Sequence, residues 1–427
     1  AIAYDSRYYS PEFADEAALC MAANGIKAYV FDELRPTPEL SFALRTLGCI
    51  SGIVVTASHN PPEYNGYKVY WEDGAQVTAP RDHEIIDEVE HVTDFHTVKT
   101  MSKDDAIEAG LYQYIGEEID VAYMEELKKQ IIHPEIIKEV ADELKIVYTP
   151  FHGTGNKPVR RILAELGFKH VYVVPEQERP DPAFTTLDYP NPEDPKAFTL
   201  ALKLAKKVDA DIVLATDPDA DRLGIYAKDS KTGEYMPFTG NMSGMLIAEY
   251  ILRERTKNGT MPENPALVET IVTTDMAKAI AKAYNVALIE VLTGFKYIAE
   301  IIREHEGKMQ YIGGGEESFG FLAGDFVRDK DAVSACSLAA EAAAWARTQG
   351  MTLYDLLKDI YVKYGFYKEA MVYIVRKGKE GADEIKKMMD DYRANPPKTI
   401  GGSPVITIKD YLSSESLDVR DGKRSTI

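Results

Sequence analysis

The chain is poor in cysteine and has no long hydrophobic run. Its three cysteines, Cys20, Cys49 and Cys336, lie far apart among 427 residues, which excludes a disulfide-rich framework and a zinc-type cluster of cysteines and histidines. A few widely spaced cysteines are typical of a protein whose thiols stay free in a reducing cytosol. No apolar stretch reaches the roughly 20 residues of a membrane-spanning helix, and no signal peptide is visible. We therefore expect a cytoplasmic protein that does not enter a membrane.

Positive charge is also scarce in this sequence. The 49 lysines and arginines are outnumbered by 69 aspartates and glutamates, which gives a formal net charge of −20. This balance argues against a surface for nucleic acid or for anionic lipid. It does not exclude a small phosphorylated ligand, because a local basic pocket can lie within an acidic protein.

Short apolar runs alternate with amphipathic patterns along the chain, which is typical of α/β folds. The runs predict strands at 27–31, 53–56, 67–71, 145–148, 171–174, 212–215, 223–227, 266–270, 286–290 and 309–312. The amphipathic patterns predict helices at 12–24, 38–47, 81–91, 121–129, 158–166, 195–208, 240–255, 275–284, 296–305 and 331–349. The length suggests roughly two to four domains. From the polar stretch at 92–120 and the start of fresh α/β series, we expect divisions at 1–118, 119–236, 237–395 and 396–427.

The stretch LATDPDADRLGIYA, residues 214–227, carries Asp217, Asp219 and Asp221 at every second position. In an extended loop, residues two apart project to the same side, where three carboxylates repel one another unless a cation holds them. Oxygen-only ligands suit a hard cation, Mg²⁺ first and then Mn²⁺ or Ca²⁺. An EF-hand is a poor match, since its loop needs a glycine where this one has Arg222. For these residues alone, a solvated acidic turn is the alternative.

The stretch SGIVVTASHNPPEYNGYKVYW, residues 51–71, places Ser58 in a turn between two strands. This serine could be an activated nucleophile or could carry a phosphate. A Ser/His/Asp hydrolase would use the neighbouring His59, but no G-x-S-x-G elbow is present, and we interpret His59 as a structural hydrogen-bonding residue. In the second strand, Lys68 and Tyr70 share one face, so that Lys68 is expected to point back over the turn.

The stretch MQYIGGGEESFGF, residues 309–321, runs from a strand into three glycines and then into Glu316, Glu317 and Ser318. Glycines let the backbone bend tightly and approach a ligand closely. Carboxylates and a hydroxyl at the end of such a loop suit hydrogen bonds to sugar hydroxyls. A plain turn between a strand and a helix is the alternative.

Taken together, the three loops resemble those of the α-D-phosphohexomutases, most closely the branch of bacterial phosphoglucomutase/phosphomannomutase and phosphopentomutase-type enzymes. TASHNP resembles the phosphoserine loop of that family, DPDADR its metal loop and GEESFG its sugar-recognition loop, in the family's order. YDSR, TPFHGTG, TGFK and RDKDA, at 4–7, 149–155, 293–296 and 328–332, resemble further family segments. The resemblance implies three related α/β domains with mixed sheets around a central cleft, which carry the three loops in turn.

The family also has a fourth domain with a phosphate-binding R-x-S-G-T-E-P motif, and several dozen more residues before YDSR. Neither feature is found in this sequence. We therefore expect a chain that is truncated at both ends, in which residues 396–427 lead toward a fourth domain that is absent.

The resemblance implies a role for each residue of the predicted site. Ser58 would be a phosphoserine, and a phosphoryl oxygen on it would join the three aspartates around Mg²⁺. Lys68 and Arg7 would transfer protons or hold the phosphoserine, and a lysine acting as a base would need a lowered pKa. The remaining residues are Glu316 and Ser318 at the sugar hydroxyls, Arg222, Lys296 and Lys330 along the cleft, Thr293 and Gly294 in the TGFK loop, and His59 and Asn60 as supports of the phosphoserine loop.

The implied reaction interconverts hexose 1-phosphate and hexose 6-phosphate, with glucose as the first choice and mannose as the second. It would pass through glucose 1,6-bisphosphate, which would also be the activator. A phosphopentomutase or a sugar-bisphosphate synthase of the same fold is an alternative, and a non-catalytic protein that binds sugar phosphates is another. The expected partners are small sugar phosphates, and the sequence does not indicate an oligomeric state.

Overall fold

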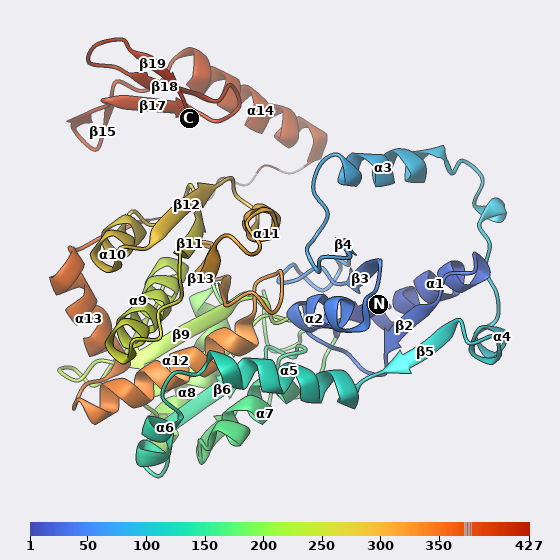
Figure 1. The fold of residues 1–427 in the computed structure, drawn as a ribbon, viewed down its shortest axis with the longest axis horizontal. Coiled ribbons are helices and arrows are strands. Elements are labelled where there is room, and N and C mark those ends of the chain that lie inside the picture. Colours follow the sequence, from blue (N-terminus) through green and yellow to red (C-terminus); the bar gives the residue numbers. More distant parts are fainter. Residues whose placement is uncertain (371–373, 375, 377) are drawn as a thin grey trace. The chain divides into compact units, whose positions relative to one another are not determined.

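Three mixed sheets, each built on the same core of four strands, form the larger part of the protein (Figure 1). The computed structural model describes residues 1–370, 374, 376 and 378–427, and it divides into two compact units, residues 1–367 and 368–427. The three sheets belong to the first unit. The second unit contains α14 (Gly378–Ala394) and two small antiparallel sheets, β15 (Thr399–Ile400) with β16 (Ser403–Pro404), and β17 (Thr407–Asp410), β18 (Glu415–Asp418) and β19 (Arg424–Thr426).

The strand order within the three sheets is as follows. The first sheet is β4 (Tyr67–Trp71), β3 (Ser51–Val55), β1 (Ile2–Tyr4), β2 (Ala28–Phe31) and β5 (Tyr112–Ile115). The second is β10 (Tyr235–Pro237), β9 (Leu223–Lys228), β8 (Ile212–Thr216), β6 (Lys145–Thr149) and β7 (His170–Val173). The third is β12 (Ala287–Val291), β11 (Pro265–Thr270), β13 (Gln310–Gly315) and β14 (Phe321–Ala323).

Helices connect and cover these sheets. In the first unit they are α1 (Ser10–Ala23), α2 (Thr37–Leu47), α3 (Arg81–His91), α4 (Lys103–Glu108), α5 (Glu117–Gln130), α6 (Pro134–Val140), α7 (Asn156–Leu166), α8 (Thr199–Val208), α9 (Gly240–Asn258), α10 (Met276–Tyr284), α11 (Phe295–Glu304), α12 (Ala332–Thr348) and α13 (Leu353–Tyr364). Within the described residues, no helix has both the length and the apolar character needed to cross a membrane.

A repeated topology explains where the three predicted loops lie. In each sheet the first parallel strand pairs with the second and the third, and an antiparallel strand then pairs with the third. The turn between the third parallel strand and its antiparallel neighbour is therefore equivalent in all three sheets. These turns follow β3, β8 and β13, and they carry Ser58, the three aspartates and Glu316. Carboxyl ends of parallel strands are the usual edge for ligand sites in α/β sheets.

The α/β class and the mixed sheets are confirmed, as are the expected strands and helices, with ends that differ by a few residues. Strand β5 was not predicted. It lies in the polar stretch 92–120 but pairs with β2, and only its two terminal residues, Tyr112 and Ile115, are buried. So short and polar an edge strand carries little periodic signal. The expected domain 237–395 includes residues 371–373, 375 and 377, which lie outside the described residues.

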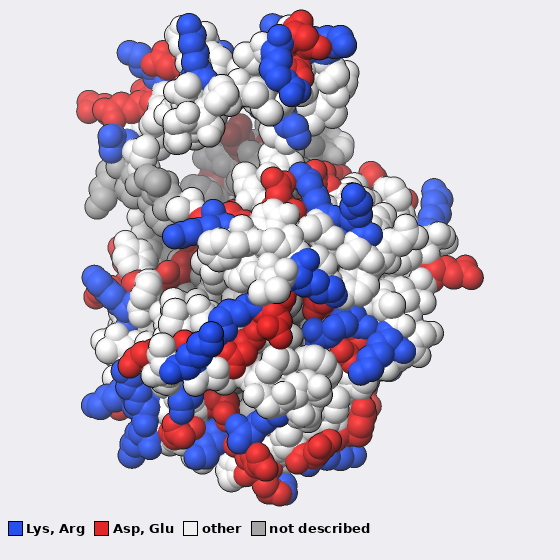
Figure 2. Space-filling model, turned by 90° about the vertical axis from the view of Figure 1, so that its left-hand side faces the viewer, with Lys and Arg blue, Asp and Glu red and all other residues white. Residues whose placement is uncertain are grey.

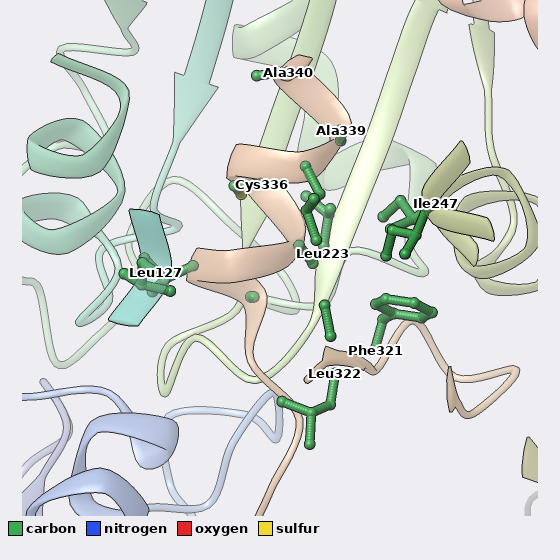
Figure 3. Packing of buried hydrophobic residues seen from close by; sticks show 14 of the residues in the cluster. Leu127, Leu223, Ile247, Phe321, Leu322, Cys336, Ala339 and Ala340 are labelled. Atoms are coloured by element: carbon green, nitrogen blue, oxygen red, sulfur yellow. The ribbon is translucent and has the colours of Figure 1, made fainter. Parts of the chain in front are cut away.

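The Ala-rich helix α12 lies at the centre of the largest hydrophobic core (Figure 3). Its small side chains, among them Cys336 and Ala339, are fully buried and let neighbouring elements approach the helix closely. The neighbours include α5, α6, α7, α9, α13, β8, β9 and β14, which come from the second and third sheet regions. Leu223 of β9 and Ile247 of α9 are among the side chains drawn around the helix. The start of the helix is tied to both regions, because the backbone N–H of Asp331 donates to the carbonyl of Phe321 at 2.9 Å and that of Ala332 donates to the carbonyl of Ala220 at 3.1 Å.

Charges of both signs are interspersed on the surface. On the face drawn in Figure 2, Lys and Arg side chains lie next to Asp and Glu, and the described residues form no broad basic patch there. Many charged side chains form ion pairs near the surface, such as Lys128 with Glu165 at 2.6 Å. Surface pairs of this kind contribute little to stability individually.

One buried carboxyl group, Glu269 of β11, generates a prediction about stability. Its side chain is 2% exposed and Oε2 has no hydrogen-bond partner. Burial, and next the charge of Glu290, raise the pKa of Glu269 from 4.5 to about 8. The folded protein therefore holds this proton at pH values at which the unfolded chain has released it, so that stability falls as the pH rises from the ordinary pKa toward the raised one.

We expect Glu269→Gln to remove this pH dependence, because glutamine keeps the shape without a proton to lose. Between about pH 5 and about pH 8 the unfolding free energy of the wild type should fall by roughly 2–4 kcal/mol more than that of the variant. Thermal unfolding at both pH values measures the difference. The exposed Glu263→Gln is the control, and parallel profiles of wild type and Glu269→Gln would contradict the prediction.

Candidate active site

Ser58 lies at the start of the turn that follows β3, in contact with the second sheet. Its hydroxyl donates a hydrogen bond to Oδ2 of Asp217 at 2.8 Å, across 159 residues of sequence. Its backbone N–H donates to Oγ1 of Thr56 at 2.8 Å, and its φ of 50° is unusual for a residue other than glycine. The predicted meeting of this serine with the acidic loop is thus found in the structure.

Arg7, which follows β1, holds the backbone of the serine turn. The guanidinium is buried, and Nε lies 3.2 Å from Oδ2 of Asp5. Its two terminal nitrogens donate to four backbone carbonyls, those of Ser58 (2.5 Å), Asn60 (2.5 Å), Pro61 (2.8 Å) and Tyr64 (3.0 Å). Burial lowers the pKa of Arg7, but a guanidinium stays protonated in proteins, so its nitrogens remain donors. These contacts shape the turn that presents Ser58.

The three aspartates converge in the turn after β8. One carboxylate oxygen from each of Asp217, Asp219 and Asp221 lies within 4.8 Å of the others, and all three residues are buried. Two buried oxygens, Oδ1 of Asp219 and Oδ1 of Asp221, have no hydrogen-bond partner. Burial raises the pKa of Asp217 and of Asp221. Oxygen-only donors that are buried, two of them without a hydrogen-bond partner, fit the requirements of a hard divalent cation such as Mg²⁺.

Lysines from the first and third sheet regions contact these acids. Nζ of Lys68 lies 3.0 Å from Oδ2 of Asp219 and 3.8 Å from Oδ2 of Asp221. Nζ of Lys330 lies 3.2 Å from Oδ2 of Asp221. Burial alone would lower the pKa of Lys68, but the two carboxylates outweigh it and raise that pKa. The structure thus places Lys68 as an ion-pair partner of two carboxylates, with its pKa raised above the ordinary value.

Glu316 lies in the turn 316–320 between β13 and β14, here called the sugar loop after the motif that it resembles, and it is joined to the same centre. It is 9% exposed, its Oε1 accepts a hydrogen bond from the backbone N–H of Gly294 at 3.1 Å, and its Oε2 lies 3.8 Å from Nζ of Lys330. Gly294 has a φ of 122°, a conformation that favours glycine, so the backbone of the TGFK loop requires a glycine at this position. The backbone N–H of Leu223 donates to the carbonyl of Phe319 at 3.0 Å, which ties the sugar loop to the strand that leaves the acidic loop.

The remaining predicted residues lie around this centre or apart from it. Arg222 pairs with Glu193 at 2.8 Å, and its Nε lies 3.8 Å from Asp221. Nδ1 of His59 lies 3.4 Å from the Ser58 hydroxyl. Burial, and next the charge of Arg222, lower the pKa of His59 to about 3, which keeps the ring neutral. Three predicted residues form no described hydrogen bond or ion pair with the other predicted residues of the site: Lys296, which lies 3.5 Å from Asp82, the half-buried Ser318 and the exposed Thr293.

Sequence reasoning missed several buried polar residues beside the site. Thr37, the first residue of α2, donates through Oγ1 to Oδ2 of Asp219 at 3.0 Å and through its backbone N–H to the Asp219 carbonyl at 2.9 Å. Ser41 lies one turn further along the same helix, and both residues are 0% exposed. Two hydroxyls four residues apart on an otherwise buried helix face are a signal that could have identified them.

Comparison with known proteins gives a consistent result over the first unit. Residues 1–95, 121–232 and 239–364 match the family models described as alpha/beta/alpha domains I, II and III of phosphoglucomutase/phosphomannomutase. The chain is 36% identical to a phosphoglucomutase of Staphylococcus epidermidis over 430 residues, which are all of this chain and 76% of that protein. It is 38% identical to a phosphoglucomutase of Staphylococcus aureus over 417 residues, which are 97% of this chain and 73% of that protein.

Solved structures share the fold at lower identity. A Paramecium phosphoglucomutase, pp63/parafusin, superposes with a TM-score of 0.70 at 18% identity, over 100% of this chain and 76% of that one. A phosphoglucomutase/phosphomannomutase family protein of Burkholderia thailandensis gives a TM-score of 0.65 at 22% identity, over 84% of this chain and 70% of that one.

The acidic turn yields a prediction that needs no activity assay. We expect Asp219→Asn to weaken Mg²⁺ binding by at least about tenfold, because it removes a negative charge from the cluster. Calorimetric titration with Mg²⁺, and with Mn²⁺ followed by electron paramagnetic resonance, measures the affinity. Asp229→Asn is the control, since Asp229 is buried but pairs with Lys358. Equal affinities of wild type and Asp219→Asn would rule out the aspartates as the metal site.

Proposed function

The chain belongs to the phosphoglucomutase/phosphomannomutase family, a family of hexose-phosphate mutases, and on that premise we propose that it interconverts glucose 1-phosphate and glucose 6-phosphate through a phosphorylated Ser58. The observation that carries the proposal is the 2.8 Å hydrogen bond between the Ser58 hydroxyl and Asp217. It brings a serine able to carry a phosphate to a buried cluster of oxygens suited to a divalent cation.

Phosphoryl transfer asks mainly for alignment and for neutralisation of negative charge. Asp217, Asp219 and Asp221 would hold Mg²⁺, which supplies positive charge beside the transferring group when bound. Lys68 and Lys330 keep their protons and add positive charge from two sides, because the acids around each raise its pKa. Neither lysine is therefore placed as a base in this proposal.

The transfer itself exchanges one ester for another. The bond between phosphorus and the Ser58 oxygen breaks as a bond from phosphorus to a sugar hydroxyl oxygen forms. The sugar hydroxyl loses a proton and the serine oxygen gains one, so the step is balanced. The product is glucose 1,6-bisphosphate, which returns its other phosphate to Ser58 after it turns over, and which can therefore also prime the enzyme.

Other residues bind or position rather than react. Arg7 shapes the serine turn, since its nitrogens donate to the turn's carbonyls. Glu316 would accept hydrogen bonds from sugar hydroxyls, and Ser318 in the same loop would add a further contact. Arg222 and Lys296 would meet the phosphate that is not being transferred. We propose glucose phosphates as the preferred substrates because the curated relatives are named phosphoglucomutases.

We expect Ser58→Ala to lower mutase activity by at least about a thousandfold, because the proposed mechanism passes the phosphate through this hydroxyl. Intact mass before and after phosphatase treatment should show one phosphoryl group on the wild type and none on the variant. Ser413→Ala, on an exposed turn of the second unit, is the control and should keep both properties. Wild-type activity in Ser58→Ala would contradict the covalent mechanism.

The choice of sugar is tested separately. Initial rates on glucose 1-phosphate, mannose 1-phosphate and ribose 1-phosphate, each primed with the matching bisphosphate, should rank glucose first. Turnover of ribose 1-phosphate alone would identify a phosphopentomutase instead. Net accumulation of a sugar bisphosphate without monophosphate product would identify a bisphosphate synthase. Binding of these sugars without any turnover would identify a non-catalytic relative.

A further inference from the structure

Among the described residues, only Lys330 forms ion pairs with both the acidic loop and the sugar loop, with Asp221 at 3.2 Å and with Glu316 at 3.8 Å. Its aliphatic stem runs directly over Gly320, where an added Cβ would lie 2.1 Å from Lys330 Cδ. A long, flexible side chain has many rotamers, and holding it in one of them costs entropy. Something in the fold must therefore restrict it.

The preceding residue, Asp329, provides part of that restriction. Its Oδ1 accepts a hydrogen bond from the backbone N–H of Lys330 at 2.8 Å and another from Nζ at 3.3 Å. Its Oδ2 accepts a hydrogen bond from the hydroxyl of Tyr70 at 2.5 Å. Tyr70 is 0% exposed and Asp329 is 4% exposed, so water does not compete for these bonds.

A second contact holds the same segment one residue earlier. The backbone N–H of Arg328 donates to Oγ of Ser41 at 2.8 Å, and the Ser41 hydroxyl donates to the carbonyl of Gly74 at 2.6 Å. Ser41 lies on α2 and Tyr70 lies on β4, so both belong to the first sheet region, which carries Ser58. The segment that bears Lys330 is thus attached to that region at two successive residues.

Strand β4 acts on both lysines: it carries Lys68 itself, and its Tyr70 bonds Asp329, the residue before Lys330. Lys68 and Tyr70 are two residues apart on one face of the strand, as the sequence predicted. Lys68 contacts Asp219 directly, whereas Tyr70 acts through Asp329. A shift of this strand would therefore move both positive charges relative to the acids.

We propose that Tyr70 and Ser41 are positioning residues that hold Lys330 between the acidic loop and the sugar loop. The proposal rests on the proposed function, in which Lys330 neutralises charge during transfer. Tyr70 does not touch substrate or the reacting atoms. Its hydroxyl orients Asp329, and Asp329 in turn fixes the backbone and the ammonium group of Lys330.

The test uses Tyr70→Phe, which deletes only the hydroxyl, and Ser41→Ala as a second variant. We expect each to lower kcat/KM for glucose 1-phosphate by about tenfold, mainly through kcat, because a misplaced charge costs alignment in the transfer step. Tyr250→Phe is the matched control. Tyr250 is equally buried and its hydroxyl donates to the carboxylate of Glu341 at 3.0 Å, away from the three loops.

A double-mutant cycle separates positioning from general destabilisation. In a Lys330→Met background, Tyr70→Phe should lower kcat/KM by less than about twofold, because the group that it positions is no longer present. An equal loss in both backgrounds, or no loss in the single variant, would overturn the proposal. A tenfold loss in Tyr250→Phe would also overturn it, since the effect would then belong to any buried tyrosine hydroxyl.

A crystal structure of Tyr70→Phe gives a readout that needs no activity. Lys330 Nζ should leave Asp221 in this variant and stay beside it in Tyr250→Phe. Retention of the contact in Tyr70→Phe would refute the positioning role even if the wild type proved inactive on every sugar. Inactivity of the wild type would instead refute the proposed function, so the two failures are distinguishable.

Discussion

Repulsion among three buried carboxylates is the constraint on which the rest of the site depends. Asp217, Asp219 and Asp221 lie within one turn and away from water, where like charges interact more strongly than in solution. Three positive side chains offset this repulsion: Lys68 from β4, Lys330 from the segment before α12, and Arg222 from the loop itself. A divalent cation would complete the balance that these side chains begin.

The same topology, used three times, brings the required groups to one place. In each sheet the turn after the third parallel strand carries part of the site, and each of these turns contains a residue other than glycine with positive φ: Ser58 (50°), Ala220 (52°) and Phe319 (69°). Such conformations are costly and persist only where the surroundings enforce them. Arg7 provides that support at Ser58, and the hydrogen bond from Leu223 provides it at Phe319.

Helix α12 connects the chemistry to the stability of the fold. It packs between elements of the second and third sheets, and it begins directly after the segment that carries Lys330. Asp331 caps the helix by accepting hydrogen bonds from the backbone N–H groups of Val333 and Ser334. Because the helix is well packed and capped, the position of its first residue is fixed. In our proposal, Tyr70 and Ser41 then hold the preceding segment so that Lys330 lies between the two loops.

Local patterns in the sequence determined the α/β class, most strands and helices, and the three loops, because apolar periodicity and short motifs are properties of neighbouring residues. The sequence also predicted that Lys68 and Tyr70 share a face, since strand periodicity alone decides that. Only the tertiary structure decided that Thr37 and Lys68 meet Asp219, and that the edge strand β5 exists. Hydrogen bonds and ion pairs between residues 151 to 182 positions apart depend on how sheets pack together, and no local pattern records that packing.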